Sequence, residues 1–330
     1  MSDAKRLTVV YEHPHWFTPL FRELDRRSIS YRRVDASVET FDPGALSPDR
    51  DVVFNRISPS SWTRGRGALI PAAQRWLRDL EDRGVDVING AQTFDLEISK
   101  AAQLELLRKA GARAPRTRTV ERPGQLLEAS RALEFPLIIK PNAGGSGAGI
   151  RRFLTSEHLA TTLAAEEIEI AANDVLLLQE YHPPRDGSIV RIETIDARFL
   201  YAIRIHLGDS PGFDLCPADV CKTADGQQLS NAACATDVQK SGLSVEAYDP
   251  PAHVIATVER IARASQLDVG GIEYLQSDRD GEIYYYDVNA LSNFVSDPLR
   301  VIGFDPTARL VDSIQQRLRV TDVALAGRAS

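Results

Sequence analysis

The chain has 330 residues, of which 43% are hydrophobic and 26% are charged, and its formal net charge is -7. These fractions are typical of a globular protein with two or three subdomains, and the negative charge argues against broad nucleic-acid binding, which requires a basic face. No apolar run is long enough to span a bilayer and no signal peptide opens the chain, so we expect a cytoplasmic protein without a membrane partner.

The first part of the chain predicts an open α/β domain. Short apolar runs, RLTVVYE and DVVFN, alternate there with helical-looking stretches over residues 1–95. Ligands of such sheets bind beyond the carboxyl ends of the strands. Arg56 directly follows the second run, where an arginine fork would bind a carboxylate through two parallel hydrogen bonds. A solubilising surface charge is the alternative interpretation of this arginine.

The segment SKAAQLELLRKAG predicts a helix that begins after a capping serine, Ser99, and stops at Gly111. Lys100 then lies at the N-terminal end of this helix. Unpaired backbone N–H groups and the helix dipole would join its ammonium there in favouring phosphate. An exposed helix lysine is the alternative.

Strand and helix patterns predict a small α+β domain within residues 96–182. In it, FPLIIKPNAGGSGAGIRRFL places Lys140 at the end of an apolar run, before a glycine-rich loop. A Walker A lysine follows its glycines, and a dinucleotide fingerprint opens a helix, so the loop matches neither. We interpret it as a flap over phosphate groups, although a glycine-rich loop alone is more often a mere turn. The flap residues are Gly144, Gly145, Ser146 and Gly147.

The remaining chain predicts a larger domain over residues 183–320 and a frayed tail over residues 321–330. SIVRIETID and RFLYAIRIH predict a hairpin that turns at Asp196, and HVIATVERIARASQL predicts a covering helix. Residues 208–251 between them are largely polar and lack periodicity. Loops of that length are usually functional or disordered.

GGIEYL and IYYYDVNALSN predict a second hairpin, joined by SDRDGE. If residues 279–281 form its loop with the glycine in the left-handed region, Asp278 pairs with Glu282, and Glu273 then faces Asp287. A two-residue turn would instead put Glu273 and Asp287 on opposite faces of the hairpin. A solvated strand face with incidental acids is a further alternative.

In the first register these acids form a metal site. Opposed residues have Cβ atoms roughly 4.5–5.5 Å apart, and Asn289, two residues after Asp287, shares the face of the two carboxylates. All-oxygen ligands suit Mg²⁺, which binds through one or two carboxylates together with the phosphates of a nucleotide. We therefore predict a magnesium site formed by Glu273, Asp287 and Asn289.

These motifs, in this order, resemble the ATP-grasp superfamily. Within it they are most similar to the glutamate ligases that modify ribosomal protein tails, with bacterial glutathione synthetase and D-alanyl-D-alanine ligase as more distant relatives. The resemblance implies the ATP-grasp fold, of α/β and α+β class, with an N-terminal open α/β (pre-ATP-grasp) domain, a small lid domain and a larger antiparallel-sheet domain. It is carried by DVVFNRIS, DVINGAQTFDLEISKAAQLELLRKAGARAPRT, FPLIIKPNAGGSGAGI, VLLLQEY, GGIEYL and YYYDVNALSN.

The resemblance also implies roles for individual residues. Lys100 and Lys140 would contact the α- and β-phosphates of ATP under the flap, and Arg56 matches a substrate-binding position. Glu273, Asp287 and Asn289 would hold Mg²⁺, with Mn²⁺ as an alternative metal. The hinge whose backbone reads the adenine edge would be Gln179, Glu180 and Tyr181.

Three departures from the family pattern affect the substrate site. Asp186 is slightly out of step with the acid that relatives place near the ribose. The chain lacks an Arg-x-Asn segment, so Arg191 and Arg204 are the nearest cationic candidates for steadying an acyl phosphate. Asn289 is not followed by a small residue and Pro-Gly, so the loop that shapes the acceptor pocket should differ.

The resemblance implies an ATP-dependent carboxylate–amine ligase that works through an acyl phosphate and releases ADP and phosphate. Its partners would be small-molecule or peptide carboxylates and amines, and the enzyme could form homo-oligomers. A phosphotransferase or carboxylase with the same nucleotide site, and a non-catalytic ATP-binding module, are the alternatives. The sequence identifies neither the acid, the amine nor the general base.

Overall fold

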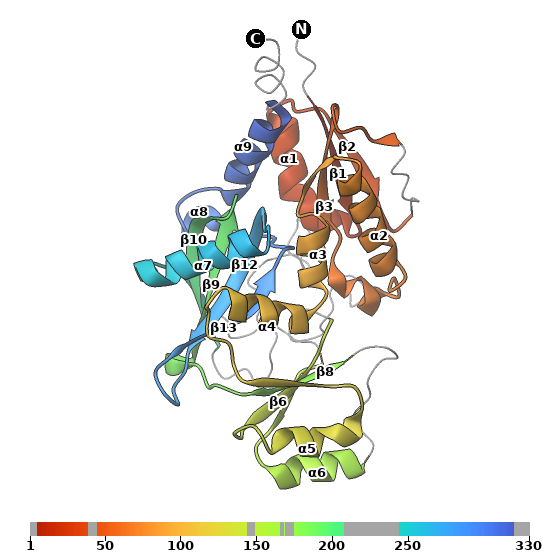
Figure 1. The fold of residues 1–330 in the computed structure, drawn as a ribbon. Helices are drawn as coiled ribbons and strands as arrows, with labels where there is room; N and C mark the ends of the chain where they lie inside the picture. Colours follow the sequence, from red (N-terminus) through yellow and green to blue (C-terminus); the bar gives the residue numbers. More distant parts are fainter. Residues whose placement is uncertain are drawn as a thin grey trace.

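Three β-sheets organise the part of the chain that the structure describes (Figure 1). Residues 144–148 and 208–243 lie outside the described part of the chain, so the flap glycines and most of the long polar loop stay predictions. No helix in the described part is long and apolar enough to cross a membrane. The computed structural model describes residues 5–38, 45–143, 149–165, 168, 175–207 and 244–319.

The first sheet is parallel, with strand order β2-β1-β3-β4. Its central strands β1 and β3 are apolar on both faces because helices cover both, as is usual for a parallel sheet. This confirms the predicted open α/β arrangement. Its elements are β1 (Arg6–Tyr11), η1 (Pro14–Phe17), α1 (Thr18–Arg26), β2 (Tyr31–Asp35), β3 (Asp51–Arg56), η3 (Pro59–Arg64), α2 (Leu69–Asp82), β4 (Asp86–Ile88) and α3 (Ala91–Glu97).

The second sheet is small and antiparallel, with strand order β5-β8-β6-β7, and α5 and α6 cover one of its faces (Figure 1). Helix α4 precedes it and confirms the predicted helix: Ser99 caps its N-terminus, and Gly111, at φ +64°, follows its end. The elements are α4 (Lys100–Lys109), β5 (Thr117–Val120), η4 (Pro123–Gln125), α5 (Leu126–Ser130), β6 (Leu137–Pro141), β7 (Arg151–Phe153), α6 (Ser156–Ala164) and β8 (Leu176–Glu180).

The third sheet is antiparallel, with strand order β11-β10-β9-β12-β13. Its first hairpin turns at Asp196 and Ala197, both at positive φ, which confirms the predicted turn. Helices α4 and α7 pack on one face. The elements are η5 (Arg185–Gly187), β9 (Ser188–Ile195), β10 (Arg198–His206), β11 (Ser244–Tyr248), α7 (Ala252–Ala264), β12 (Val269–Gln276), β13 (Ile283–Asn289), α8 (Pro298–Val301) and α9 (Pro306–Arg319).

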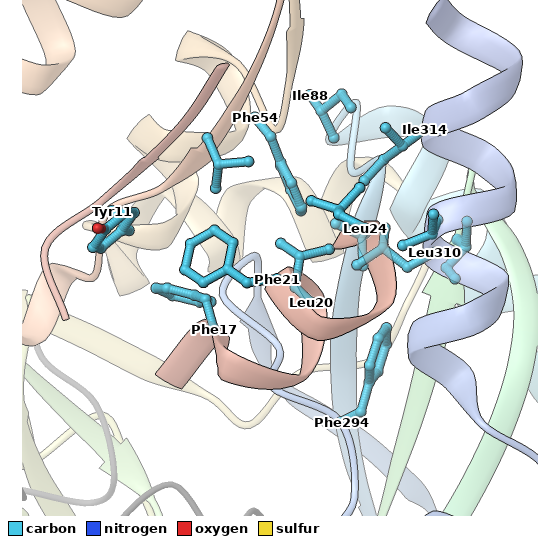
Figure 2. Close-up of a cluster of buried hydrophobic side chains, with 14 of the residues drawn as sticks. Tyr11, Phe17, Leu20, Phe21, Leu24, Phe54, Ile88, Phe294, Leu310 and Ile314 are labelled. Atoms are coloured by element: carbon cyan, nitrogen blue, oxygen red, sulfur yellow. The ribbon is translucent and has the colours of Figure 1, made fainter. Parts of the chain in front are cut away.

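An apolar core joins the first sheet to the other face of the third. Phe17, Phe21 and Leu24 belong to one buried cluster with Leu310 and Ile314 of α9, which returns to lie beside α1 (Figures 1 and 2). Burying a large apolar side chain contributes about 1.5–3 kcal/mol. This shared core therefore holds the carboxyl end of β3 next to the third sheet.

Asn89 locks the same junction through hydrogen bonds. Its side-chain Nδ2 donates to the carbonyls of Val269 and Ala290, both at 2.7 Å. Its Oδ1 accepts from the N–H groups of Asp268 (3.0 Å) and Val269 (3.1 Å). One buried amide thus fixes the end of β4 to the start of β12 and to the chain directly after β13.

Candidate functional site

The β12–β13 hairpin pairs Glu273 with Asp287, as predicted. Its turn differs from the prediction, because Ser277, rather than Asp278, donates its N–H to the Glu282 carbonyl, at 2.8 Å. The loop is therefore one residue longer than expected. Gly281 does adopt the left-handed region, at φ +78°.

A β-bulge at Tyr286 restores the predicted pairing of the acids. Near the turn Tyr274 pairs with Tyr285, whereas one step further Glu273 pairs with Asp287, so Tyr286 is the extra residue. Without the bulge, the register of the turn would place Glu273 opposite Tyr286. The extra residue in the turn shifts the register by one position, and the extra residue in the bulge shifts it back. The two carboxylates therefore face one another.

Each acid of the site contacts a cation. The ammonium of Lys100 donates to Oδ1 of Asp287, and NH1 of Arg191 lies 3.1 Å from Oε1 of Glu273. Burial raises the pKa of Glu273, although Arg191 opposes the change. Burial would also raise the pKa of Asp287, but the positive charges of Lys100 and then Lys140 outweigh burial and lower the pKa of that carboxyl.

The oxygen atoms of Glu273, Asp287 and Asn289 fit a hard divalent cation. Gly271 pairs with Asn289 two ladder positions from the acids, so the amide shares their face. In the described part of the chain no three His, Cys, Asp or Glu side chains gather into a metal cluster. A third donor could be the amide oxygen of Asn289, since two carboxylates plus neutral oxygens suit Mg²⁺.

Helix α4 delivers Lys100 to Asp287. The side chain of Gln103 donates to the Val288 carbonyl (2.9 Å) and accepts its N–H (3.2 Å), which lays α4 along the open edge of β13. At the helix start, the N–H of Lys100 donates to the backbone carbonyl of Asn142 at 2.9 Å, and the N–H of Ala101 donates to the side-chain Oδ1 of Asn142 at 3.0 Å. These two N–H groups, which were expected to be free for phosphate, are thus occupied, and Lys100 reaches the site with its ammonium.

Lys140, at the end of β6, is buried beside the same site. Its Nζ lies 3.4 Å from Oε1 of Gln179, whose Nε2 donates to Oγ1 of Thr117 at 2.8 Å. Burial, and then the positive charge of Lys100, lower the pKa of Lys140 to about 8. The second sheet therefore holds this lysine in place at a cost in stability.

We expect Lys140→Met to stabilise the protein against urea at pH 7. Below pH 8 the folded chain must keep a buried ammonium, so the destabilisation is fully present there. It disappears as the pH rises toward 10.5, the ordinary value for lysine. A pKa change of this size corresponds to at most about 3 kcal/mol.

Urea unfolding of Lys140→Met at pH 7 and at pH 9.5 measures this effect, with Lys109→Met on an exposed stretch of α4 as the matched control. The gain should shrink at the higher pH. A variant less stable than the natural protein at pH 7 would show that Lys140 is not a buried cation.

The predicted hinge residues lie at the end of β8, where much of their hydrogen-bonding capacity is used internally. The N–H of Glu180 donates to the backbone carbonyl of Arg116, and the N–H of Tyr181 donates to the backbone carbonyl of Pro136, both at 2.9 Å. An adenine edge would therefore have to bind other backbone groups of this segment. Asp186 is exposed in the turn before β9, at φ +55°.

Only one of the two candidate arginines lies with the acids. Arg191 on β9 pairs with Glu273, whereas Arg204 on β10 pairs with Val190 and so occupies the opposite face of the sheet. Arg204 contacts Glu246 at 3.7 Å and stacks 4.2 Å from the ring of Tyr248. The sheet separates it from Glu273, Asp287 and Asn289.

Arg56 is buried where the first domain meets the chain after β13. Its NH2 donates to the Ser292 carbonyl, and its guanidinium lies 4.9 Å from the ring of Phe17. Its Nε and NH1 have no hydrogen-bond partner in the described part of the chain. Burial lowers its pKa to about 10, so a charged guanidinium stands there with two unused donors.

Glu97 is a residue of this region that the sequence did not indicate. It ends α3 and accepts a hydrogen bond from the N–H of Ala290, next to Asn289. Burial raises its pKa to about 7, and Asp287 adds to the rise. In the sequence it is an ordinary helix acid, and only the long-range packing of α3 on β13 reveals it.

No protein-family model matches the chain. Among curated proteins it is 28% identical over 224 residues to the carbamoyl phosphate synthase large chain of Thermotoga petrophila, a match that covers 62% of this chain and 20% of that one. The chain thus aligns with about one fifth of that relative.

Solved structures match over nearly the whole chain. The D-alanine–D-alanine ligase from Bacillus anthracis complexed with ATP has a TM-score of 0.66 at 16% identity, covering 97% of this chain and 99% of that one. The ATP-grasp ligase PsnB complexed with a phosphomimetic variant of its minimal precursor, Mg and ADP has a TM-score of 0.65 at 19% identity, covering 96% and 99%. At these identities the likeness concerns the fold.

Proposed function

We propose that this chain, which has the ATP-grasp fold implied by its sequence motifs, is an ATP-dependent carboxylate–amine ligase. The observation that carries the proposal is the convergence of Lys100 and Lys140 on the acids paired across the β12–β13 hairpin. Cations and acids at one point are what a metal–triphosphate complex requires, because phosphoryl transfer depends mainly on positioning and charge neutralisation.

In this proposal Lys100 and Lys140 bind the phosphates of ATP. Glu273, Asp287 and Asn289 hold Mg²⁺, which when bound neutralises charge on the phosphate oxygens. Because Lys100 and Arg191 contact the two carboxylates directly, both cations must turn from them toward the phosphates and the acyl group.

The reaction then has two steps. An oxygen of the substrate carboxylate forms a bond to the γ-phosphorus while the bond from that phosphorus to the β,γ-bridging oxygen breaks, giving an acyl phosphate and ADP. The amine nitrogen next bonds to the acyl carbon, the C–O bond to phosphate breaks, and the nitrogen loses a proton. Arg191, on the face of the acids, stabilises the acyl phosphate.

Arg56 is the proposed contact for the substrate carboxylate. Its two unused buried donors, Nε and NH1, match the two oxygens of a carboxylate. The solved neighbours include a D-alanine–D-alanine ligase and the ligase PsnB complexed with a precursor peptide. Small-molecule and peptide acids are therefore both candidate substrates.

The proposal is tested by incubating the protein with ATP, Mg²⁺ and pooled amino acids, then measuring ADP, free phosphate and, with added hydroxylamine, hydroxamate. We expect ADP and phosphate in equal amounts, with hydroxamate reporting the acyl phosphate. A stable phosphorylated product without free phosphate would indicate a phosphotransferase. ATP binding without ATP turnover, whichever acceptor is added, would indicate a non-catalytic ATP-binding module.

A further inference from the structure

The guanidinium of Arg191 is held at three points on the face of the acids. Its Nε donates to Oε1 of Glu193 at 2.6 Å, and its NH1 to Oε1 of Glu273 at 3.1 Å. Its NH2 lies 3.3 Å from Oγ of Ser292, in the chain after β13. Each nitrogen thus has a different partner, and the contacts with Glu193 and Ser292 can hold the side chain when NH1 turns from Glu273 toward the acyl group.

Gly271 makes room for this arrangement. It pairs with Glu193 across β9 and β12, and a Cβ atom added to it would lie 2.7 Å from Nε of Arg191 and 2.9 Å from Oε1 of Glu193. Gly271 is not in the left-handed region, where glycine is favoured for its backbone. A Cβ at this position would therefore displace the Arg191–Glu193 pair, whose side chains fill that space.

Glu193 depends on the same pair. It is 1% exposed, and its Oε2 is buried without a hydrogen-bond partner in the described part of the chain. A buried carboxylate without a hydrogen-bonded cation is strongly disfavoured. Glu193 and Arg191 thus hold each other in place above Gly271.

We propose that Gly271 and Glu193 form a socket that positions Arg191 for acyl transfer, and that neither residue contacts the nucleotide. This rests on the proposed function for its chemistry but on the contacts above for its geometry. Glu193 is then a positioning residue that acts only through Arg191. The socket should control the rate of the chemical steps and leave the affinity for ADP with Mg²⁺ unchanged.

The kinetic test is a double-mutant cycle. Glu193→Gln and Gly271→Ala should each lower kcat for ADP formation roughly 10- to 100-fold, since a misplacement of about 1 Å can cost about 100-fold. In the Arg191→Ala background neither substitution should lower kcat by more than a further factor of about two, which is the margin within which such cycles resolve an effect. Losses that multiply, or a weakened ADP·Mg²⁺ affinity in titration calorimetry, would overturn the socket.

The control is Gly124→Ala, because Gly124 is also outside the left-handed region and has open space where the Cβ would lie. It should leave kcat unchanged. A crystal structure of Gly271→Ala tests the geometry without any turnover: the Arg191 guanidinium should leave Glu193 while β9 and β12 keep their register. An unmoved guanidinium refutes the socket, whereas an inactive natural protein refutes only the proposed ligase.

Discussion

Replacing Asp287 with asparagine is expected to abolish ATP turnover while the protein stays folded. Asp287 forms an ion pair with the Lys100 ammonium and faces Glu273, so the substitution removes a negative charge from the place where the lysines and acids meet. Substitutions that only disturb the orientation of metal ligands already cost about 10- to 100-fold. Loss of a ligand charge itself should therefore cost at least about 100-fold in ADP formation.

The measurement is the initial rate of ADP release at saturating Mg²⁺, together with a thermal melt to check folding. Asp278→Asn is the matched control, because Asp278 is exposed in the turn of the same hairpin. We expect that control to keep the natural rate. An Asp287→Asn protein that is folded and turns over ATP normally would remove Asp287 from the site.

Asn89→Ala should unfold the protein at a much lower urea concentration than the natural chain requires. The substitution leaves four backbone groups without their hydrogen-bond partner: the carbonyls of Val269 and Ala290 and the N–H groups of Asp268 and Val269. Each buried group left unsatisfied costs about 1–3 kcal/mol, so a loss of about 4 kcal/mol or more is expected.

The backbone adds a second, smaller cost, since Asn89 lies at φ +53°, a region that asparagine tolerates better than alanine. Asn89→Gly separates the two effects, because glycine keeps the backbone but loses the same hydrogen bonds. We expect the glycine variant to be destabilised, and the alanine variant further still. An alanine variant within about 1 kcal/mol of the natural protein would contradict this role.

Local patterns predicted the parts of the fold that depend on neighbouring residues. The cap at Ser99, the turn at Asp196 and the left-handed Gly281 all follow from local side-chain and backbone preferences. The pairing of Glu273 with Asp287 was also predicted, but through a turn one residue too short and without the bulge at Tyr286 that compensates for it.

The face of each arginine shows what a single sequence leaves open. The turn at Asp196 alone would leave Arg191 and Arg204 on one face, because it pairs Ile195 with Arg198. A bulge at Leu200 shifts the register by one residue and places the two arginines on opposite faces, so only one of them can join the acids. Choosing between them requires the pairing of β9 with β12, a contact between segments about 80 residues apart, as the Arg191 to Glu273 separation shows. No local pattern encodes that contact.

Residues whose importance comes from long-range packing had no sequence signal. Asn89 and Glu97 look like ordinary polar residues of a turn and a helix, yet they bind the backbone of β12 and of the chain after β13. Gly271 likewise resembles a strand glycine until Arg191 is seen above it. Such roles emerge only when the first and third sheets are placed together.

A crystal structure with a nonhydrolysable ATP analogue and Mg²⁺ tests the central claim most directly. The triphosphate should lie between Lys100 and Lys140, with the metal bound by Glu273, Asp287 and Asn289, and with Lys100 turned from the carboxylate toward phosphate. A nucleotide bound elsewhere, with Lys100 still on Asp287 and Arg191 still on Glu273, would contradict the account.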